Sequence, residues 1–428
     1  MDRRQFISGS AAASGLLLLK SKTVFGYEAN SAVRLALLGC GSRGTSVATS
    51  FAKNTSARIV ALADIFPDRL QQGKAHFDEV ASSLGYAGVD PKQMFHGYKA
   101  FEEVAASSDV DAVQISTPPW FHVEHLDAVV RAGKHAYCEK PVGVDIAQTN
   151  HALEIAKRVG SKVSVDVGFQ IRSAPPYVEI VRRIHEGALG KIACIAGYYN
   201  APPSQYPERT GMSADEVRLR NWLWDRVLSG DILVEQNIHI IDVCNWILQS
   251  HPVSAIAHAG RNVISHMGDI HDNYQVVYTY PDDVHVNFSS TQFAPGHWFE
   301  AGVQVFGAKG IAEAPYSGPL RVIGDKGSDN NWAWSDPEQA QQSSQPATFA
   351  ANGAFTDNLA FADRDKDRGF IESITSGKFH NQIELGVESA RSCMLGRMAA
   401  DQKREVTWSD LLAHGEQYKL TIDMKQFS

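Results

Sequence analysis

The glycine-rich segment GCGSRG, at residues 39–44, constrains the fold more than any other feature of the sequence. It follows an apolar run at residues 33–38 and places Gly39, Gly41 and Gly44 in the GxGxxG spacing. A tight turn needs the first glycine, close approach of the backbone to a pyrophosphate needs the second, and packing of a helix on a strand needs the third. The N–H groups of the helix that follows then point at the phosphates. The segment therefore predicts a dinucleotide-binding turn between a strand and a helix.

An acidic residue stands at the expected distance from this turn. Asp64, which lies 20 residues after Gly44, follows a second apolar run at residues 58–63. A carboxylate at this position accepts the ribose 2′-hydroxyl of NAD and repels the 2′-phosphate of NADP. We therefore expect NAD as the cofactor, while Arg43 and Arg69 keep NADP open.

The first half of the chain alternates short aliphatic runs with segments of helical periodicity. Strands are expected at residues 33–38, 58–63, 112–115, 135–138 and 162–167. Apolar residues at helical spacing mark helices at residues 123–132 and 146–159. This alternation predicts βαβ units around a doubly wound parallel sheet, whose ligands bind at the carboxyl ends of the strands.

Two further segments follow strands that end at the same crevice. STPPWFH follows the strand at 112–115, and CEKPVG continues the strand at 135–138. A lysine before a proline at a strand end is, taken alone, more often a solvated charge than a catalyst. The predicted cofactor-binding residues are Gly39, Gly41, Ser42, Arg43, Gly44, Asp64, Thr117, Pro118, His122, Glu139 and Lys140.

Together, GCGSRG, STPPWFH, AGKHAYCEKP and GDILVEQNIHIID resemble the Gfo/Idh/MocA family of oxidoreductases. The resemblance implies a Rossmann domain followed by an α/β domain whose large, open, mostly antiparallel sheet covers the nicotinamide and often forms the oligomer interface. We expect a signal peptide and linker at residues 1–29, the Rossmann domain at 30–160, and the C-terminal substrate and oligomerisation domain at 161–428. A homo-oligomer, either a dimer or a tetramer, is expected on the same ground.

The resemblance also assigns catalytic residues. Lys140 matches the family lysine that contacts the nicotinamide ribose and the reacting hydroxyl, and Glu235 and His239 match its Asp-x-x-x-His run. Residues four apart share a helix face, so both side chains should point at one substrate. We expect His239 to take the hydroxyl proton and Lys140 to stabilise the negative charge that develops on oxygen. Glu235 replaces the usual aspartate, and its extra methylene moves the carboxylate by about 1.5 Å, which leaves the contacted sugar hydroxyl open.

The second half of the chain predicts an antiparallel sheet. Alternating patterns mark strands at residues 191–199, 255–261, 273–280, 285–290 and 302–306, and a helix is expected near residues 388–400. Residues 325–356 are polar, lack periodicity and predict a long loop or arm. The predicted substrate-binding residues are Gln170, Arg172, Tyr177, Arg220, Asn221 and Trp222.

The N-terminus has the layout of an export signal. Arg3 and Arg4 precede Phe6 and an apolar stretch at residues 7–19, which is shorter than the ~20 residues that a membrane span needs. The paired arginines resemble a twin-arginine signal, whose route exports folded proteins. We therefore expect a periplasmic protein that loads its cofactor before export and holds it tightly.

The net charge and the acidic residues at 269–272 bear on whether nucleic acid or a metal ion is expected as a partner. Forty Lys and Arg against 48 Asp and Glu give a net charge of −8, which favours a small-molecule partner over nucleic acid. Asp269, His271 and Asp272 lie close in sequence, but a turn explains them as well as a cation site does, so no metal is expected.

The sequence thus predicts an NAD(P)-dependent oxidoreductase that transfers hydride between nicotinamide and a sugar, polyol or sugar derivative. Three alternatives stay open. A glycosidase resembling glycoside hydrolase family 109 would use transient oxidation and elimination, although that family lacks a lysine at the position of Lys140. A hydride-exchanging enzyme would keep its nicotinamide and act on two sugars in turn. A non-catalytic sugar sensor is disfavoured by the presence of Lys140 and His239.

Overall fold

The computed structural model describes residues 32–207, 210–296, 298–335 and 357–428. A six-stranded parallel sheet organises the first part of the chain in the order β3-β2-β1-β4-β5-β6. Its strands are β1 (Arg34–Leu38), β2 (Arg58–Asp64), β3 (Met94–His96), β4 (Ala112–Ile115), β5 (His135–Cys138) and β6 (Val165–Val167). The predicted doubly wound sheet is confirmed, and its order reverses between β1 and β4, which is where ligands bind on such sheets. The sheet extends to β6, past the limit at residue 160 that we expected for the first domain.

Helices cover both faces of this sheet. They are α3 (Ser42–Asn54), α4 (Pro67–Ser83), α5 (Ala100–Ala106), α6 (His122–Arg131) and α7 (Ile146–Val159). Alternate residues of β1 serve the two faces: Leu35 and Leu37 pack with α3 and α4, whereas Ala36 and Leu38 pack with α5, α6 and α7. This double burial explains why the strands read as continuous apolar runs.

A nine-stranded sheet organises the second part, in the order β14-β13-β12-β11-β7-β10-β9-β8-β15. Its strands are β7 (Ile192–Asn200), β8 (Ser254–Gly260), β9 (Asn273–Tyr280), β10 (Val284–Thr291), β11 (Glu300–Gly307), β12 (Gly310–Pro315), β13 (Arg321–Gly324), β14 (Trp332–Ala333) and β15 (Val406–Thr407). Every neighbouring pair is antiparallel except β7 and β10. The five predicted strands correspond to β7 to β11, whereas β12 to β15 were not predicted.

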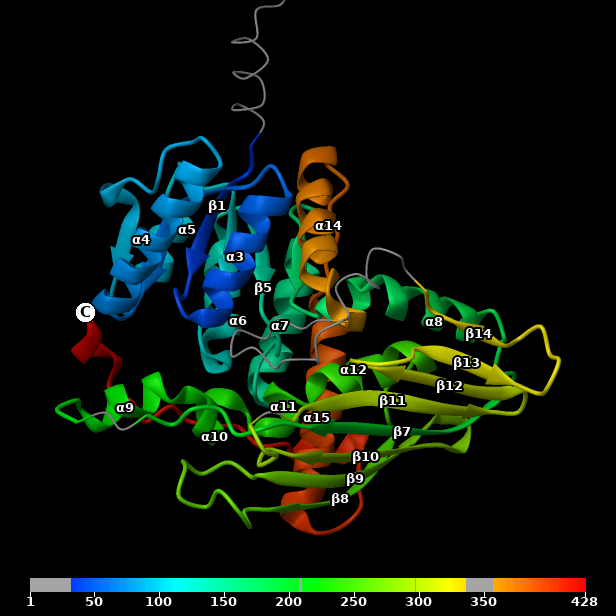
Figure 1. The fold of residues 1–428 in the computed structure, drawn as a ribbon. Coiled ribbons are helices and arrows are strands. Elements are labelled where there is room, and N and C mark those ends of the chain that lie inside the picture. The colour runs from blue at the N-terminus through cyan, green and yellow to red at the C-terminus, as the bar shows by residue number, and fades with distance from the viewer. Residues whose placement is uncertain (1–31, 208–209, 297, 336–356) are drawn as a thin grey trace, which may run out of the picture.

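One face of the second sheet is covered and the other is exposed. Along β9, Tyr274, Val276 and Tyr278 are buried, while Gln275 and Val277 are exposed. The helices α8 (Pro175–His185), α12 (Ile238–Leu248) and α15 (Ile383–Gln402) pack on this sheet, and Figure 1 shows α8 and α12 on the side that faces the Rossmann domain. The helix expected near residues 388–400 is part of α15.

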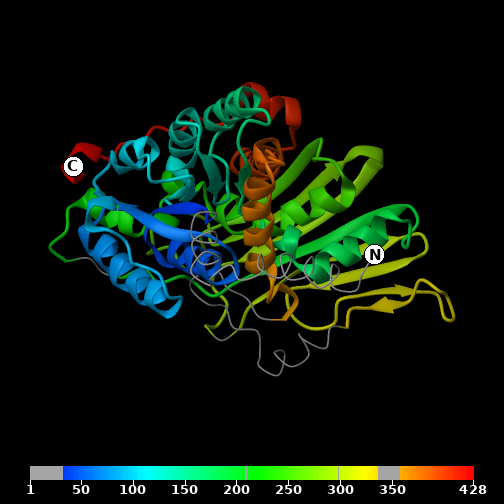
Figure 2. The same cartoon turned by 90° about the horizontal axis from the view of Figure 1, so that it is seen from above.

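The two domains share one hydrophobic core. A single cluster takes in Val113 and Leu126 of the Rossmann domain together with Ile240 and Tyr278 of the second domain. The chain then returns to the first domain through α14 (Ala362–Ser376), which packs on α3 and stands beside the Rossmann domain in both views (Figures 1 and 2). The domains are therefore held together by packing as well as by the chain.

The remaining helices are all short. They are α9 (Ala214–Arg220), α10 (Arg226–Ser229), α11 (Ile232–Glu235) and α16 (Trp408–His414). The predicted export signal at residues 1–29 and residues 336–356 of the predicted arm lie outside the described residues. None of the helices in the described parts of the chain is long and apolar enough to cross a membrane.

Candidate active site

The glycine turn has the geometry that its spacing predicts. Gly39 has a φ of +97°, and a Cβ there would lie 2.6 Å from the carbonyl oxygen of Ser116. A Cβ on Gly44 would lie 2.1 Å from the carbonyl oxygen of Gly39, so α3 packs too closely on β1 for a side chain. A Cβ on Gly41 would meet no atom of the described chain within 4 Å. The first and third glycines thus shape the turn, and the second leaves space for a bound group.

Asp64 ends β2 with its carboxylate fixed toward this turn. Its Oδ2 accepts the N–H of Cys40 at 2.7 Å, and its Oδ1 accepts the N–H of Phe66 at 2.8 Å. Burial raises the pKa of the Asp64 carboxyl, and the two N–H bonds oppose this rise. Each carboxylate oxygen keeps accepting capacity for a ribose hydroxyl.

A pocket of about 540 Å³ opens beside Gly41, between α3 and α4. It is lined by Cys40, Gly41, Ser42, Thr45, Ser46, Thr49, Arg69, Gln72, Gly73 and His76. Ser42 is exposed at the start of α3. Because Arg69 lines this pocket, a cation stands near the position where NAD and NADP differ.

Arg43 and Glu139 engage each other. Arg43 Nε donates to Glu139 Oε1 at 2.9 Å, and its two terminal nitrogens donate to the carboxylate of Asp363 at 2.8 Å each. These bonds join α3, the segment after β5 and α14. The two residues predicted to contact the cofactor therefore also brace the segment that carries Lys140.

His122 joins the segments that follow β4 and β5. Its buried ring has Nδ1 2.8 Å from the carbonyl oxygen of Pro141 and Nε2 2.7 Å from that of Thr117. The Thr117 hydroxyl in turn lies 3.0 Å from His125 Nδ1, and Pro118 begins the short turn that leads to α6. The imidazole thus fixes the peptide that follows Lys140.

Lys140 and Glu235 form an ion pair between the two domains. Lys140 Nζ donates to Glu235 Oε1 at 2.7 Å and also to the Glu235 carbonyl oxygen, and both side chains are about 11% exposed. Glu235, which we expected to contact the substrate, accepts a hydrogen bond from Lys140 at the same position.

His239 lies close to this pair. We expected one helix to carry both residues, but the structure has two, α11 and α12, because the helix is interrupted at Gln236 and Asn237. His239 is 7% exposed, and its Nδ1 has no hydrogen-bond partner among the described residues. Burial, followed by the positive charges of Lys140 and Arg43, holds the pKa of His239 well below its usual range. The imidazole is therefore neutral near pH 7.

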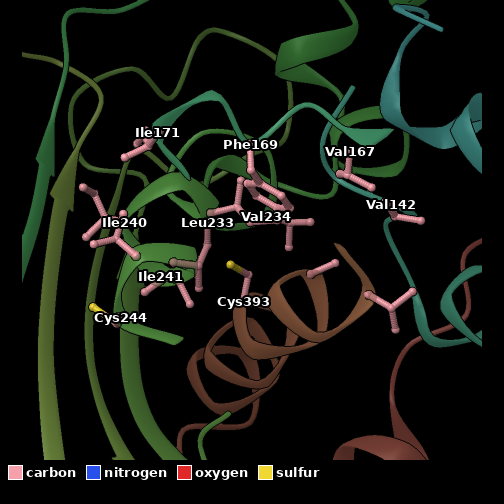
Figure 3. Close-up of a cluster of buried hydrophobic side chains, with 14 of the residues drawn as sticks. Val142, Val167, Phe169, Ile171, Leu233, Val234, Ile240, Ile241, Cys244 and Cys393 are labelled. Atoms are coloured by element: carbon pink, nitrogen blue, oxygen red, sulfur yellow. The ribbon is translucent and has the colours of Figure 1, made fainter. Parts of the chain in front are cut away.

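Hydrophobic packing positions the helices that carry Glu235 and His239. Figure 3 shows Leu233 and Val234 of α11 and Ile240 and Ile241 of α12 around Cys393 of α15. Three residues from the carboxyl end of the Rossmann sheet complete this cluster: Val142, Val167 and Phe169. The ring of Phe169 also meets the His239 ring edge-on, with centroids 6.5 Å apart. The catalytic candidates thus stand on one packed surface built from both domains.

Three of the predicted substrate-binding residues follow β6. Gln170 is buried, and its Oε1 has no partner in the described chain. Arg172 is held by Asp242, with Nε donating at 2.8 Å. Tyr177 is fully buried in the core, and its hydroxyl donates to the carbonyl oxygen of Ala314 at 2.8 Å, so it does not face an open site.

The other three predicted substrate-binding residues lie near the segment that follows β2. Arg220 donates to both carboxylate oxygens of Asp68, at 3.0 and 2.7 Å. Trp222 packs with an apolar cluster that contains Phe66, and buried Asn221 has an unpartnered Nδ2 within the described chain. The sequence alone did not separate this group from residues near His239.

The side chains of Asp269, His271 and Asp272 make hydrogen bonds within the protein that stabilise local turns. Asp272 accepts the N–H groups of Val263 and Ile264, and His271 Nδ1 lies 2.7 Å from Oδ2 of buried Asp231, a partner that sequence reasoning missed. Within the described ranges, no group of three or more His, Cys, Asp or Glu side chains is arranged to hold a metal ion.

Comparison with known proteins places both domains. Residues 33–167 match the oxidoreductase family with an NAD-binding Rossmann fold, and residues 177–313 match the GFO/IDH/MocA C-terminal domain. Inositol 2-dehydrogenase from Rhizobium meliloti (strain 1021) is 26% identical over 295 residues, which are 68% of this chain and 78% of that protein.

Two crystal structures are similar in fold. One is scyllo-inositol dehydrogenase from Lactobacillus casei with bound NAD(H) and scyllo-inositol, with a TM-score of 0.66 and 18% identity over 88% of this chain and 99% of that chain. The other is aldose-aldose oxidoreductase from Caulobacter crescentus complexed with glycerol, with a TM-score of 0.66 and 20% identity over the same shares of the two chains.

Proposed function

Since the chain belongs to the Gfo/Idh/MocA family of oxidoreductases, we propose that it transfers hydride between NAD and a CH–OH group of a sugar, polyol or sugar derivative. The observation that carries the proposal is the meeting of Lys140, from the Rossmann domain, with Glu235 and His239, from the second domain. A histidine whose pKa is strongly lowered, next to a buried ion pair at the carboxyl end of a parallel sheet, is an expected signature of an active site.

The residues present fit NAD. The open space at Gly41 accommodates a pyrophosphate, and the free accepting capacity of Asp64 suits the adenosine ribose. When bound, NAD supplies the acceptor for the hydride of the carbinol carbon.

The protein's own groups handle the hydroxyl of the substrate. Lys140 is positioned by Glu235 to donate a hydrogen bond to the hydroxyl oxygen and to stabilise the negative charge that develops there. His239 is neutral and takes the hydroxyl proton on a ring nitrogen, which makes it the general base. Glu235 acts through Lys140 and is a positioning residue.

Several features support a polyhydroxylated substrate. Buried polar atoms without a partner in the described chain occur at Gln170, Asn237 and His239, and such atoms are costly unless a ligand or water satisfies them. A polyol supplies hydroxyl groups that both donate and accept. Similar proteins include inositol 2-dehydrogenase and an aldose-aldose oxidoreductase.

We further propose that the protein is exported folded by the twin-arginine route, with NAD already bound, and acts in the periplasm as a homo-oligomer. The support for export is the N-terminal Arg3, Arg4 and Phe6 pattern and the apolar stretch that follows it. The support for assembly is the uncovered face of the second sheet, where Ile256 is 51% exposed and Val277 is 44% exposed.

The test is to purify the protein, extract it with acid, and measure the nicotinamide that co-purifies, then to screen polyols, sugars and aryl glycosides. Lys140→Met is expected to abolish turnover and leave NAD bound, whereas Lys157→Met, at an exposed lysine of α7, serves as the matched control. Lys140→Met activity near that of the unmodified protein would overturn the assignment. Aglycone release without a net change in nicotinamide absorbance would instead identify a glycosidase.

A further inference from the structure

A small apolar cluster brings together four segments that are distant in sequence. Its buried members are Phe66 after β2, Phe121 after β4, Leu219 and Leu228 from the segment that holds α9 and α10, and Ile422 near the C-terminus. Trp222, Met424 and Phe427 pack against it. We call residues 420–428 the C-terminal tail.

This cluster lies at the adenosine end of the cofactor site. Phe66 comes two residues after Asp64, the carboxylate suited to the adenosine ribose, and its N–H holds that carboxylate. Phe121 belongs to the segment that follows β4, on the other side of the crevice between β1 and β4. The cluster therefore joins the two walls between which the adenosine of a dinucleotide binds.

The C-terminal tail is fastened to the Rossmann domain by specific contacts. The ring of Phe427 meets the Phe66 ring edge-on, with centroids 5.9 Å apart, and the Phe427 carbonyl accepts the N–H of Tyr98 at 3.0 Å. A Cβ on Gly97 would lie 3.0 Å from the same carbonyl oxygen, so the tail backbone approaches Gly97 closely. Figure 1 shows the chain ending next to α4, at the edge where α9 also lies.

Arg220 of the second domain contacts the loop after β2, which carries Phe66. Its guanidinium lies 3.8 Å from the centroid of the Phe66 ring, and it is paired with Asp68. The tail is also tied to α9, because the N–H of Asp423 donates to Asp215 at 3.0 Å. Phe66 is thus contacted both by Arg220 of the second domain and by Phe427 of the C-terminal tail.

We expect cofactor release to involve local opening rather than separation of the domains. The two domains share a continuous core, so moving them apart would expose that core to water. Most residues of the C-terminal tail are exposed, and exposed peripheral segments open at the lowest free-energy cost.

We propose that the C-terminal tail and Arg220 clamp the loop after β2 and thereby make NAD a resident group that leaves the protein slowly. This inference rests on the NAD-dependent function proposed above. A slowly released cofactor suits a protein that is exported with NAD already bound.

The experiment compares cofactor release from four forms of the full chain. They are the unmodified protein, Phe427→Ala, Met424→Ala, and the control Leu412→Ala, which changes a 42% exposed residue of α16 outside the cluster. Each form is loaded with NADH and mixed with excess NAD, and the loss of bound-NADH fluorescence gives the release rate. We expect Phe427→Ala to release NADH about tenfold faster or more, which corresponds to about 1.4 kcal/mol, Met424→Ala to do so to a smaller extent, and Leu412→Ala to match the unmodified protein.

A second measurement uses the reciprocity of coupled binding. If the docked tail favours bound NAD, then NAD must favour the docked tail, so amide exchange in residues 420–428 should slow when NAD is added. Equal release rates for Phe427→Ala and Leu412→Ala, or tail exchange unaffected by NAD, would overturn the clamp and leave the proposed oxidoreductase intact. Failure of the unmodified protein to bind NAD would overturn both.

Discussion

Breaking the Lys140 and Glu235 pair should cost both stability and activity. At an effective dielectric constant near 20, two unit charges 2.7 Å apart attract by about 6 kcal/mol before the cost of desolvation. Removing one partner of a buried pair typically costs 3–5 kcal/mol, and Lys140 retains the main-chain oxygen of residue 235 as an acceptor, so we expect Glu235→Leu to lose about 3 kcal/mol of unfolding free energy. In Glu235→Asp the separation grows by about 1.5 Å, which weakens the attraction by about 2 kcal/mol.

A double-mutant cycle measures this pair directly. Lys140→Met, Glu235→Leu and the double variant are unfolded in urea, and the free energies are compared with that of the unmodified protein. The double variant leaves no unpaired charge, so we expect it to recover part of the loss, with a coupling of about 2 kcal/mol, while staying inactive. Strictly additive losses, or full stability in Glu235→Leu, would refute the view that Glu235 positions Lys140.

Two shorter predictions follow from the same site. Gly44→Ala should prevent the packing of α3 on β1, because the new Cβ would lie 2.1 Å from the Gly39 carbonyl oxygen. Gly41→Ala should change the free energy of unfolding by less than about 0.5 kcal/mol and still weaken NAD binding. Urea unfolding and calorimetric titration distinguish the two variants, and equal effects would contradict the assigned roles. His239 must be neutral to accept a proton, so kcat/KM for alcohol oxidation should fall only as pH drops through a value below the usual pKa of about 6.5. Arg43→Gln removes a positive charge and should move this acid limb to higher pH, and a limb that does not move would contradict the electrostatic explanation.

The parallel sheet was largely predictable from the sequence because its strands are buried on both faces. Continuous apolar runs marked β1, β2, β4, β5 and β6, whereas β3 is a three-residue edge strand whose sequence, Met-Phe-His, carries no alternation. In the second sheet, β7 to β11 have one covered and one exposed face, which produces the alternation that predicts them. β12 to β15 were missed because they are short or contain glycine and proline, and only their neighbours in the sheet define them as strands.

The motifs indicated which residues carry chemistry but not which partners those residues find. Lys140 and His239 were identified from their motifs, while the pairing of Lys140 with Glu235 depends on how the two domains dock. Tyr177 illustrates the same limit, because nothing in its local sequence shows that its hydroxyl reaches the carbonyl oxygen of Ala314, which lies 137 residues away. Long-range pairing of this kind follows from the tertiary fold and leaves no periodic trace in the sequence.

The path of the chain explains how Lys140 is supported from both domains. After β14, the chain forms α14, which packs on the Rossmann domain, and α15, which packs on both domains. Asp363 of α14 binds Arg43 of α3, and buried Lys366 binds Asp166 of β6 at 2.8 Å. These contacts hold the ends of the Rossmann strands. The hydrophobic core that both domains share includes residues of α11 and α12 and so positions Glu235. Lys140 therefore has opposing supports in both domains, so the geometry of the catalytic groups is set when the protein folds. Motion is then left to peripheral segments, and exchange of the cofactor depends on the C-terminal tail rather than on separation of the domains.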